Sequence, residues 1–227
     1  MTPEDFLKVK AIMERVDQTY QTVKMGYADL TGPDRSRRMT GLRNFIVFGR
    51  SLTFVLQNLR SVVPVQFEPW YAAETESMKN DPVMRYFVEA RNELEKQGKL
   101  SINTLTSLNS FTVDSDMRQF GPQPEGAVSF FIGDQLGGAG WQVIQPDGTF
   151  EKYYVQLPQG VTVTQAFSNF PESKAPQLAG KTLDEICKLY FEKLGNLVKR
   201  AETTFLDRSG LEKKARLHKG THLRLVK

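Results

Sequence analysis

Apolar residues in the first part of the chain recur at every third or fourth position, which is the spacing of one face of an α-helix. A first run covers residues 6–27 and begins soon after Thr2, with a proline and two acidic residues at its start. A second run covers residues 42–63, and Pro64 is expected to end it. The two runs predict an antiparallel pair of helices.

Two further helices carry clear signals at their ends. Asp81 and Pro82 supply a cap and a first-turn proline, and Gly98 follows the last periodic residue. Only a short aromatic stretch is expected between Pro64 and this third helix. A capping box at Thr182 and Glu185 opens the last helix. Its apolar side is predicted to comprise Leu183, Ile186, Tyr190, Leu194, Leu197, Val198 and Phe205.

The pattern changes between residues 101 and 169, where Thr, Val, Phe and Tyr are frequent and Pro and Gly punctuate the chain. This composition favours strands. The sequence Pro146-Asp147-Gly148 predicts a hairpin turn. Five strands are predicted, at residues 102–113, 127–132, 141–144, 150–156 and 161–167.

Amphipathic helices need partners to bury their apolar faces, so the helices are expected to pack together. The predicted fold is α+β, a four-helix bundle with an antiparallel β-sheet block inserted before the last helix. Residues 1–100 would form the first three helices and residues 101–170 the β insertion. Residues 181–207 would form the last bundle helix, and residues 208–227 a basic tail.

Charge and composition limit the kinds of catalytic and metal sites that the chain can contain. The net charge of +4 comes from the end of the chain, because residues 207–227 hold seven basic and two acidic residues. Both histidines also lie there, and Cys187 is the single cysteine. A disulfide, a Cys-cluster zinc site and the usual His-containing catalytic triads are therefore excluded from the body of the chain, and we expect no cofactor or metal. The polar start and the absence of a long apolar stretch predict a cytoplasmic protein without a membrane anchor.

The helix from Asp81 to Gly98 resembles the motif helix of HEPN-domain proteins, in which an arginine and a polar residue precede a histidine near the end of a bundle helix. Arg91 matches the arginine and Asn92 the polar residue. The resemblance implies a HEPN-like four-helix bundle that dimerises, with two motif helices forming a metal-independent ribonuclease site. The histidine is missing, and Lys96 is its nearest substitute.

A missing histidine matters because an ordinary lysine is already protonated and is a poor base near neutral pH. It favours a noncatalytic, dimeric interaction protein, RNA-linked or defence-linked by resemblance, with a degenerate ribonuclease motif. The alternative is an active toxin-like endoribonuclease that uses Arg91 with Lys96 in place of histidine. A plainer interpretation also stays open: Arg91 and Asn92 form a polar face near a helix end, and Lys96 interacts favourably with the helix dipole.

The basic tail is a second candidate site. Its cations could contact phosphates without sequence preference, or the tail could only increase solubility. RNA or a protein could thus bind through the tail or the β insertion, beside the expected homodimer. The glycine-rich residues 133–140 predict a hairpin loop, since they lack the Lys-Ser or Lys-Thr of a phosphate-binding loop. The candidate nucleic-acid-binding residues are Lys213, Lys214, Arg216, Lys219 and Arg224.

Overall fold

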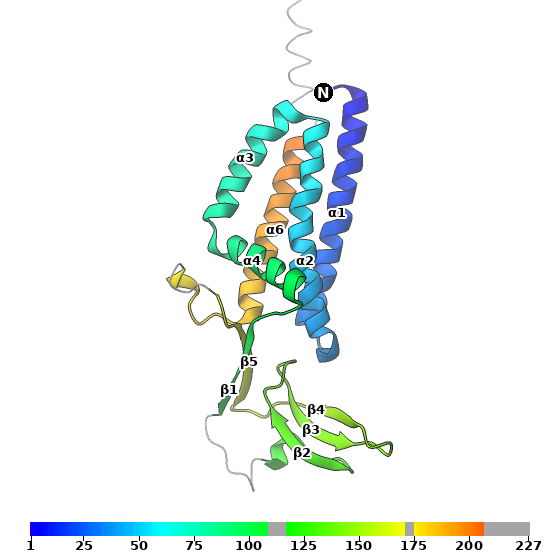
Figure 1. Cartoon of the computed structure of the whole chain (residues 1–227), viewed down its shortest axis with the longest axis vertical. Helices are drawn as coiled ribbons and strands as arrows, with labels where there is room; N and C mark the ends of the chain where they lie inside the picture. Colours follow the sequence, from blue (N-terminus) through cyan, green and yellow to red (C-terminus); the bar gives the residue numbers. More distant parts are fainter. Residues whose placement is uncertain (109–116, 171–174, 207–227) are drawn as a thin grey trace, which may run out of the picture.

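The computed structural model describes residues 1–108, 117–170 and 175–206. The described residues form helices and two antiparallel sheets, so the α+β class is confirmed. Figure 1 shows the helices gathered in one part of the molecule and the strands in the other. The α-helices are α1 (Pro3–Thr31), α2 (Arg38–Leu56), α3 (Pro64–Asn80), α4 (Pro82–Gln97) and α6 (Leu183–Phe205).

The helix ends follow their local sequence signals. Thr2 and Thr182 each form a capping box with the residue three positions later, which satisfies backbone N–H groups that have no partner inside the helix. Asp81 accepts from two backbone N–H groups at the start of α4. Gly98 ends α4 with φ of 65°, a left-handed conformation that glycine adopts without a steric penalty.

Helix α3 was not predicted, so the expectation of four bundle helices is wrong in number. Pro64 does end the preceding helical run, but it also occupies the first turn of α3, where its missing N–H costs nothing. Pro69 lies inside α3, and an internal proline argues against a helix. Packing outweighs this local preference: Phe67 is fully buried, and the ring of Trp70 lies 5.1 Å from that of Phe205 on α6.

The long helices α1, α2 and α6 lie side by side, and α4 crosses them near the sheet end of the helical part (Figure 1). Helices α1 and α2 approach so closely that a Cβ on Gly26 would lie 2.7 Å from the backbone nitrogen of Phe45. An aromatic cluster joins α2, α4 and α6. The rings of Phe87 on α4 and Tyr190 on α6 stack at 3.9 Å, and Phe45 on α2 packs edge-on against both.

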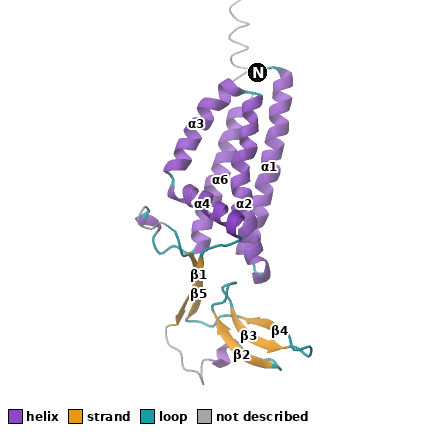
Figure 2. Ribbon diagram, viewed as in Figure 1, coloured by secondary structure: helices purple, strands orange, loops and turns teal. Residues whose placement is uncertain are grey.

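The strands form a ribbon and a sheet. Figure 2 shows the ribbon of β1 (Ile102–Leu108) and β5 (Val161–Phe167) leaving the helices, and the second sheet beyond it. That sheet has the order β2-β3-β4, with β2 at Ala127–Ile132, β3 at Ala139–Ile144 and β4 at Phe150–Val155. Strands β2 and β5 have the predicted bounds, β3 begins two residues earlier than predicted, and β4 ends one residue earlier. The predicted first strand holds as far as Leu108, and residues 109–116 lie outside the described part.

Both glycine-containing turns connect antiparallel strands, as predicted. Residues 133–138 join β2 to β3, and the turn at Gly148, with φ of 84°, joins β3 to β4. In the first loop, the buried carboxylate of Asp134 accepts from the backbone N–H of Gly138, the Tyr154 hydroxyl and the Lys152 ammonium. Hydrogen bonds within the loop and from β4 thus fix this loop.

Two arginines hold the sheets against the helices: Arg35 lies just before α2, and Arg38 is the first residue of α2. Arg35 donates to the carbonyl oxygens of Leu136 and Gly137 at 3.2 and 2.6 Å. Arg38 donates to the Gln165 side chain on β5 at 2.8 Å and forms an ion pair with Asp184 on α6 at 2.7 Å. Among the described residues, no helix is both long enough and apolar enough to cross a membrane.

Candidate ligand pocket between the helices

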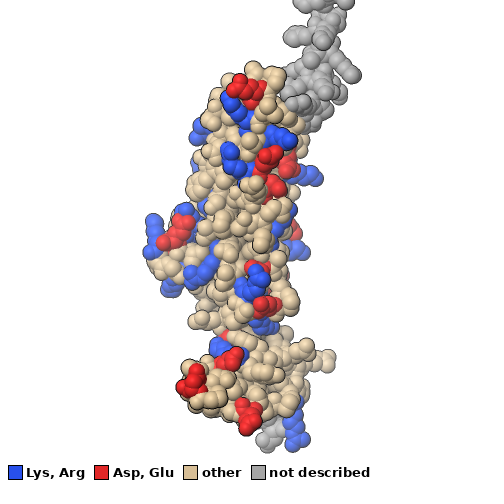
Figure 3. Space-filling model, turned by 90° about the vertical axis from the view of Figure 1, so that its right-hand side faces the viewer, with Lys and Arg blue, Asp and Glu red and all other residues tan. Residues whose placement is uncertain are grey.

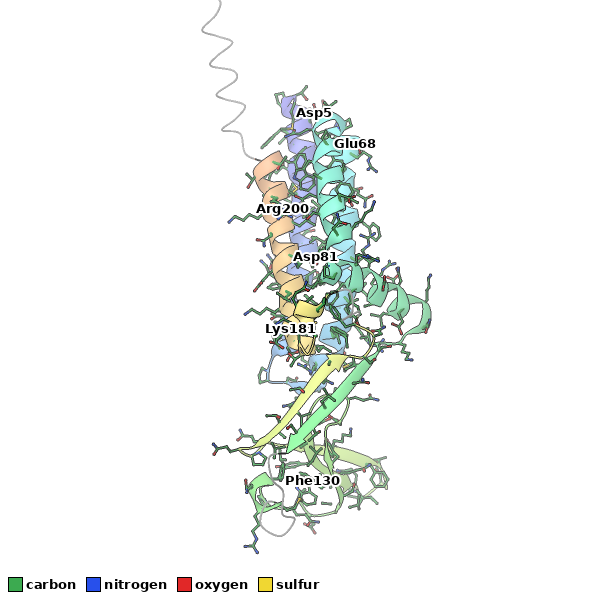
Figure 4. The ribbon with its side chains drawn as sticks, turned by 90° about the vertical axis from the view of Figure 1, so that its left-hand side faces the viewer. Asp5, Glu68, Asp81, Phe130, Lys181 and Arg200 are labelled. Carbon is green, nitrogen blue, oxygen red and sulfur yellow. The ribbon has the colours of Figure 1, made fainter. Side chains whose placement is uncertain are left out.

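A pocket of about 320 Å³ lies where the corner between α3 and α4 meets α2 and α6. Asp81 marks this corner in Figure 4. Its carboxylate pairs with Lys193 on α6. Higher on α6, Arg200 donates to both carboxylate oxygens of Glu74 on α3, each at 2.6 Å. These two links join α3 and its corner to α6.

The inner wall of the pocket is apolar and aromatic. Met84 and Tyr190 are 8% and 3% exposed, and Met78 and Val88 are partly buried beside them. Gly49 on α2 lets Tyr190 lie close, because a Cβ there would be 2.7 Å from the tyrosine ring. Burial raises the pKa of the Tyr190 hydroxyl well above its ordinary value. The wall is therefore apolar, and its tyrosine is packed closely against α2.

The mouth of the pocket is cationic. Lys79 and Arg85 are exposed and Arg50 is half-buried, while Glu89 is the acidic residue of the lining. Within the described ranges, none of the three cations forms an ion pair with a carboxylate. The mouth thus carries more positive charge than its single carboxylate offsets.

Arg50 is held in a defined orientation at this mouth. One of its terminal nitrogens donates to the Thr53 hydroxyl at 2.8 Å, and that hydroxyl donates to the Arg50 carbonyl oxygen at 2.9 Å. The guanidinium also lies 4.4 Å from the centre of the Phe54 ring. Its positive charge also offsets part of the effect of burial on the pKa of the Tyr190 hydroxyl.

Thr75 on α3 contributes to the lining a hydroxyl group without a hydrogen-bond partner in the described part of the chain. Its side-chain oxygen is buried and has no hydrogen-bond partner among the described residues. Buried hydroxyl groups nearly always have a partner, and leaving one unpaired costs free energy. The hydroxyl is therefore a polar group that the folded chain leaves unsatisfied at the pocket.

The structure brings together two of the three motif residues predicted on α4. Arg91 forms an ion pair with Glu95 at 2.7 Å and donates to the Asn92 side chain at 3.2 Å. Its guanidinium lies 5.9 Å from the centre of the Phe54 ring, and its side chain is 26% exposed. Lys96 is exposed, and in the part of the chain that the structure describes it forms no hydrogen bond or ion pair with Arg91 or Asn92. Within the described residues, Arg91 and Asn92 are thus joined by a hydrogen bond, and Lys96 is not joined to either of them.

The second predicted site cannot be placed. All of its residues, Lys213, Lys214, Arg216, Lys219 and Arg224, lie outside the described ranges. On the face of the molecule shown in Figure 3, acidic and basic side chains are interspersed along the helices and the sheet. That face presents no continuous surface of one charge.

The sequence reasoning missed the pocket because α3 was not predicted. Tyr71, Thr75 and Met78 follow one another at helical spacing and all line the pocket. This spacing was the available signal, and the two prolines of the segment obscured it.

Comparison with known proteins assigns the chain to a family. Residues 5–131, more than half of the chain, match the family described as bacteriophage lambda protein ea47. The chain belongs to the Ea47 family. Protein ea47 of Escherichia phage lambda is 30% identical over 80 residues, which are 34% of this chain and 19% of the relative. The chain thus spans about a fifth of the length of this Ea47 relative, and no solved structure matches it.

Membership in the Ea47 family overturns the HEPN resemblance. The dimeric, RNA-linked or defence-linked HEPN-like interaction protein and the toxin-like endoribonuclease were both wrong, because nothing in the match to the Ea47 family indicates a HEPN domain. Local structure explains why the motif misled. The Asp81-Pro82 pair is a helix start, and Arg91 is paired with Glu95 one turn along the same helix. Neither feature requires a ribonuclease.

Proposed function

We propose that the helical part of this Ea47-family chain binds a small molecule, and that the pocket between α2, α3, α4 and α6 is the binding site. The observation that carries the proposal is the lining, a buried apolar wall beneath cations that form no ion pair with any carboxylate of the described residues. Ligand sites in proteins typically combine apolar walls with a few placed polar groups, and their volumes start at about 300 Å³. The pocket meets both criteria.

A packing defect is the plain alternative to a binding site. Protein interiors are close-packed, and a cavity without a purpose lowers stability. Here the corner that borders the pocket is linked to α6 by two ion pairs, Asp81 with Lys193 and Glu74 with Arg200. A pocket whose borders are fixed in this way, and whose mouth holds three cations that form no ion pair within the described ranges, is better explained by an occupant.

The test is a fluorescence titration of the purified full chain with 1-anilinonaphthalene-8-sulfonate. We expect saturable binding at one site. Val88→Trp fills the partly buried pocket wall and should abolish this binding, whereas Val65→Trp, at a position on α3 that is 90% exposed, should leave it unchanged. Circular dichroism spectra and melting curves establish that both variants are folded.

A titration without saturation, or equal binding by both folded variants, would refute the proposal. If Val88→Trp does not fold, Val88→Phe provides a smaller filling change against Val65→Phe. In that pair too, retained binding by the Val88 variant would count against the site.

We further propose that residues 1–100 and 181–207 act as one unit, with residues 101–170 as an insertion. This division is supported by the pairing of Ile102 with Phe167, which brings the start and end of the insertion together. The homodimer and a protein partner for the β insertion stay predictions. Cleavage sites in limited proteolysis that fall mainly within residues 101–170 would support the division, and early cleavage inside α1 or α6 would contradict it.

A further inference from the structure

The pocket has a polarity that runs from its mouth to its inner wall. Arg85 and Lys79 are exposed at the mouth, whereas Met84 and Tyr190 are buried at the inner wall. A ligand that fits this gradient has a charged group at one end and an apolar body at the other. The gradient thus restricts the class of ligand as well as the site.

The sign of the charge follows from the groups at the mouth. Arg50, Lys79 and Arg85 face a single lining carboxylate, that of Glu89. Glu89 and Arg85 lie one helical turn apart on α4, yet they do not form an ion pair in the structure. A cationic ligand would meet three like charges there, whereas an anion would gain charge-assisted hydrogen bonds.

Arg50 is prepared for such an anion. Its contacts with the Thr53 hydroxyl and the Phe54 ring fix the plane of the guanidinium and use one of its terminal nitrogens. The arginine side chain has five N–H donors in a rigid fork that suits the two oxygens of a carboxylate. Because the orientation is already set, little conformational entropy is lost when an anion binds.

We infer that the pocket binds an amphipathic carboxylate, with its carboxylate at Arg50 and Arg85 and its apolar chain against Met78, Met84 and Val88. Methionine side chains adapt their shape to an apolar chain, which suits aliphatic ligands of varied form. This inference rests on the proposed function and specifies the chemistry of its ligand.

The test compares three probes of equal chain length by isothermal titration calorimetry on the full chain: octanoate, octanol and octylammonium. We expect octanoate to bind at least about tenfold more tightly than either of the others, since hydrogen bonds to charged groups contribute about a factor of ten or more. Equal binding of octanol, or tighter binding of octylammonium, would overturn the inference and leave the proposed function standing. Binding by none of the three probes overturns the inference, and failure of the sulfonate dye to bind as well overturns the proposed function.

A matched pair of variants locates the carboxylate. Arg85→Gln removes an exposed cation at the mouth, and Arg15→Gln removes an exposed cation on α1, away from the pocket lining. We expect octanoate binding to weaken about tenfold in Arg85→Gln and to stay unchanged in Arg15→Gln, while octanol binding changes in neither. Equal effects of the two substitutions would show that only the net charge matters, and the assigned carboxylate position would be wrong.

Discussion

The unsatisfied hydroxyl of Thr75 leads to an unusual expectation, a single substitution that stabilises the protein. Valine has nearly the shape of threonine and a similar helix propensity, so Thr75→Val replaces a buried hydroxyl that has no partner by a methyl group. Leaving a buried polar group unpaired costs about 1–3 kcal/mol, and an apolar group of the same shape avoids that cost. We expect the free energy of unfolding to rise by about 1 kcal/mol, the lower end of that range.

Urea denaturation followed by circular dichroism measures this change as a shift of the midpoint at constant slope. In thermal unfolding it corresponds to a rise of about 2–4 °C for a chain of this size. Thr53→Val is the matched control and should lower the free energy of unfolding. The buried Thr53 hydroxyl accepts a hydrogen bond from the Arg50 side chain at 2.8 Å and donates one to the Arg50 carbonyl oxygen at 2.9 Å, and the substitution removes both. If Thr75→Val lowers stability as Thr53→Val does, the hydroxyl of Thr75 has a partner in solution and the reasoning fails.

Three more substitutions test the structure at other places. Gly26→Ala should lower the free energy of unfolding by about 1–3 kcal/mol in urea, because its Cβ would lie 2.7 Å from the backbone of Phe45. Glu74→Gln should lower it by about 1–2 kcal/mol in the same assay, because it weakens the two hydrogen bonds from Arg200. Asp134→Asn should remove a pH-dependent contribution: burial raises the pKa of Asp134, but its hydrogen bonds from a lysine, a tyrosine and a backbone N–H outweigh burial and hold that pKa below 3.8. This contribution to stability is fully present when the pH is above 3.8, and it is lost as the pH falls through the lowered pKa of Asp134. The urea midpoints of the wild type and the variant should therefore converge in acid.

Each of these three expectations has a contradicting outcome. An unchanged midpoint in Gly26→Ala would mean that α1 and α2 are further apart than described. Glu68→Gln, in the exposed pair with Arg60, should cost less than about 1 kcal/mol. If Glu74→Gln and Glu68→Gln lower the free energy of unfolding equally, the half-buried pair contributes no more to stability than the exposed pair. A constant difference between wild type and Asp134→Asn down to low pH would contradict the depressed pKa.

Sequence signals predicted the elements whose ends are set by local chemistry. The capping box at Thr182 and the sequence from Asp81 to Gly98 each depend on hydrogen bonds within a few residues. Helix α6 starts where its signal places it, and α4 both starts and ends where its signals place it. The hairpin turn at Gly148 is likewise local. Signals of this kind need no knowledge of the rest of the chain.

What depends on distant contacts was not predicted. Pro64 can end one helix or begin the next, and only the burial of Phe67 against α6 decides for a helix. The pocket combines side chains from four helices, so no spacing along the chain marks it as a unit. Arg91 shows the reverse error: its short motif was visible, but its pairing with Glu95 gives it a structural partner that the motif did not take into account.

The ribbon of β1 and β5 separates the helices from the rest of the inserted segment. Ile102 and Phe167 pair at its base, so the chain leaves the helices and returns to them at the same point. The length of what lies between them therefore has no effect on where α6 begins. We thus expect a change in the length of the chain between β1 and β5 to leave the helices of this protein and their pocket in place.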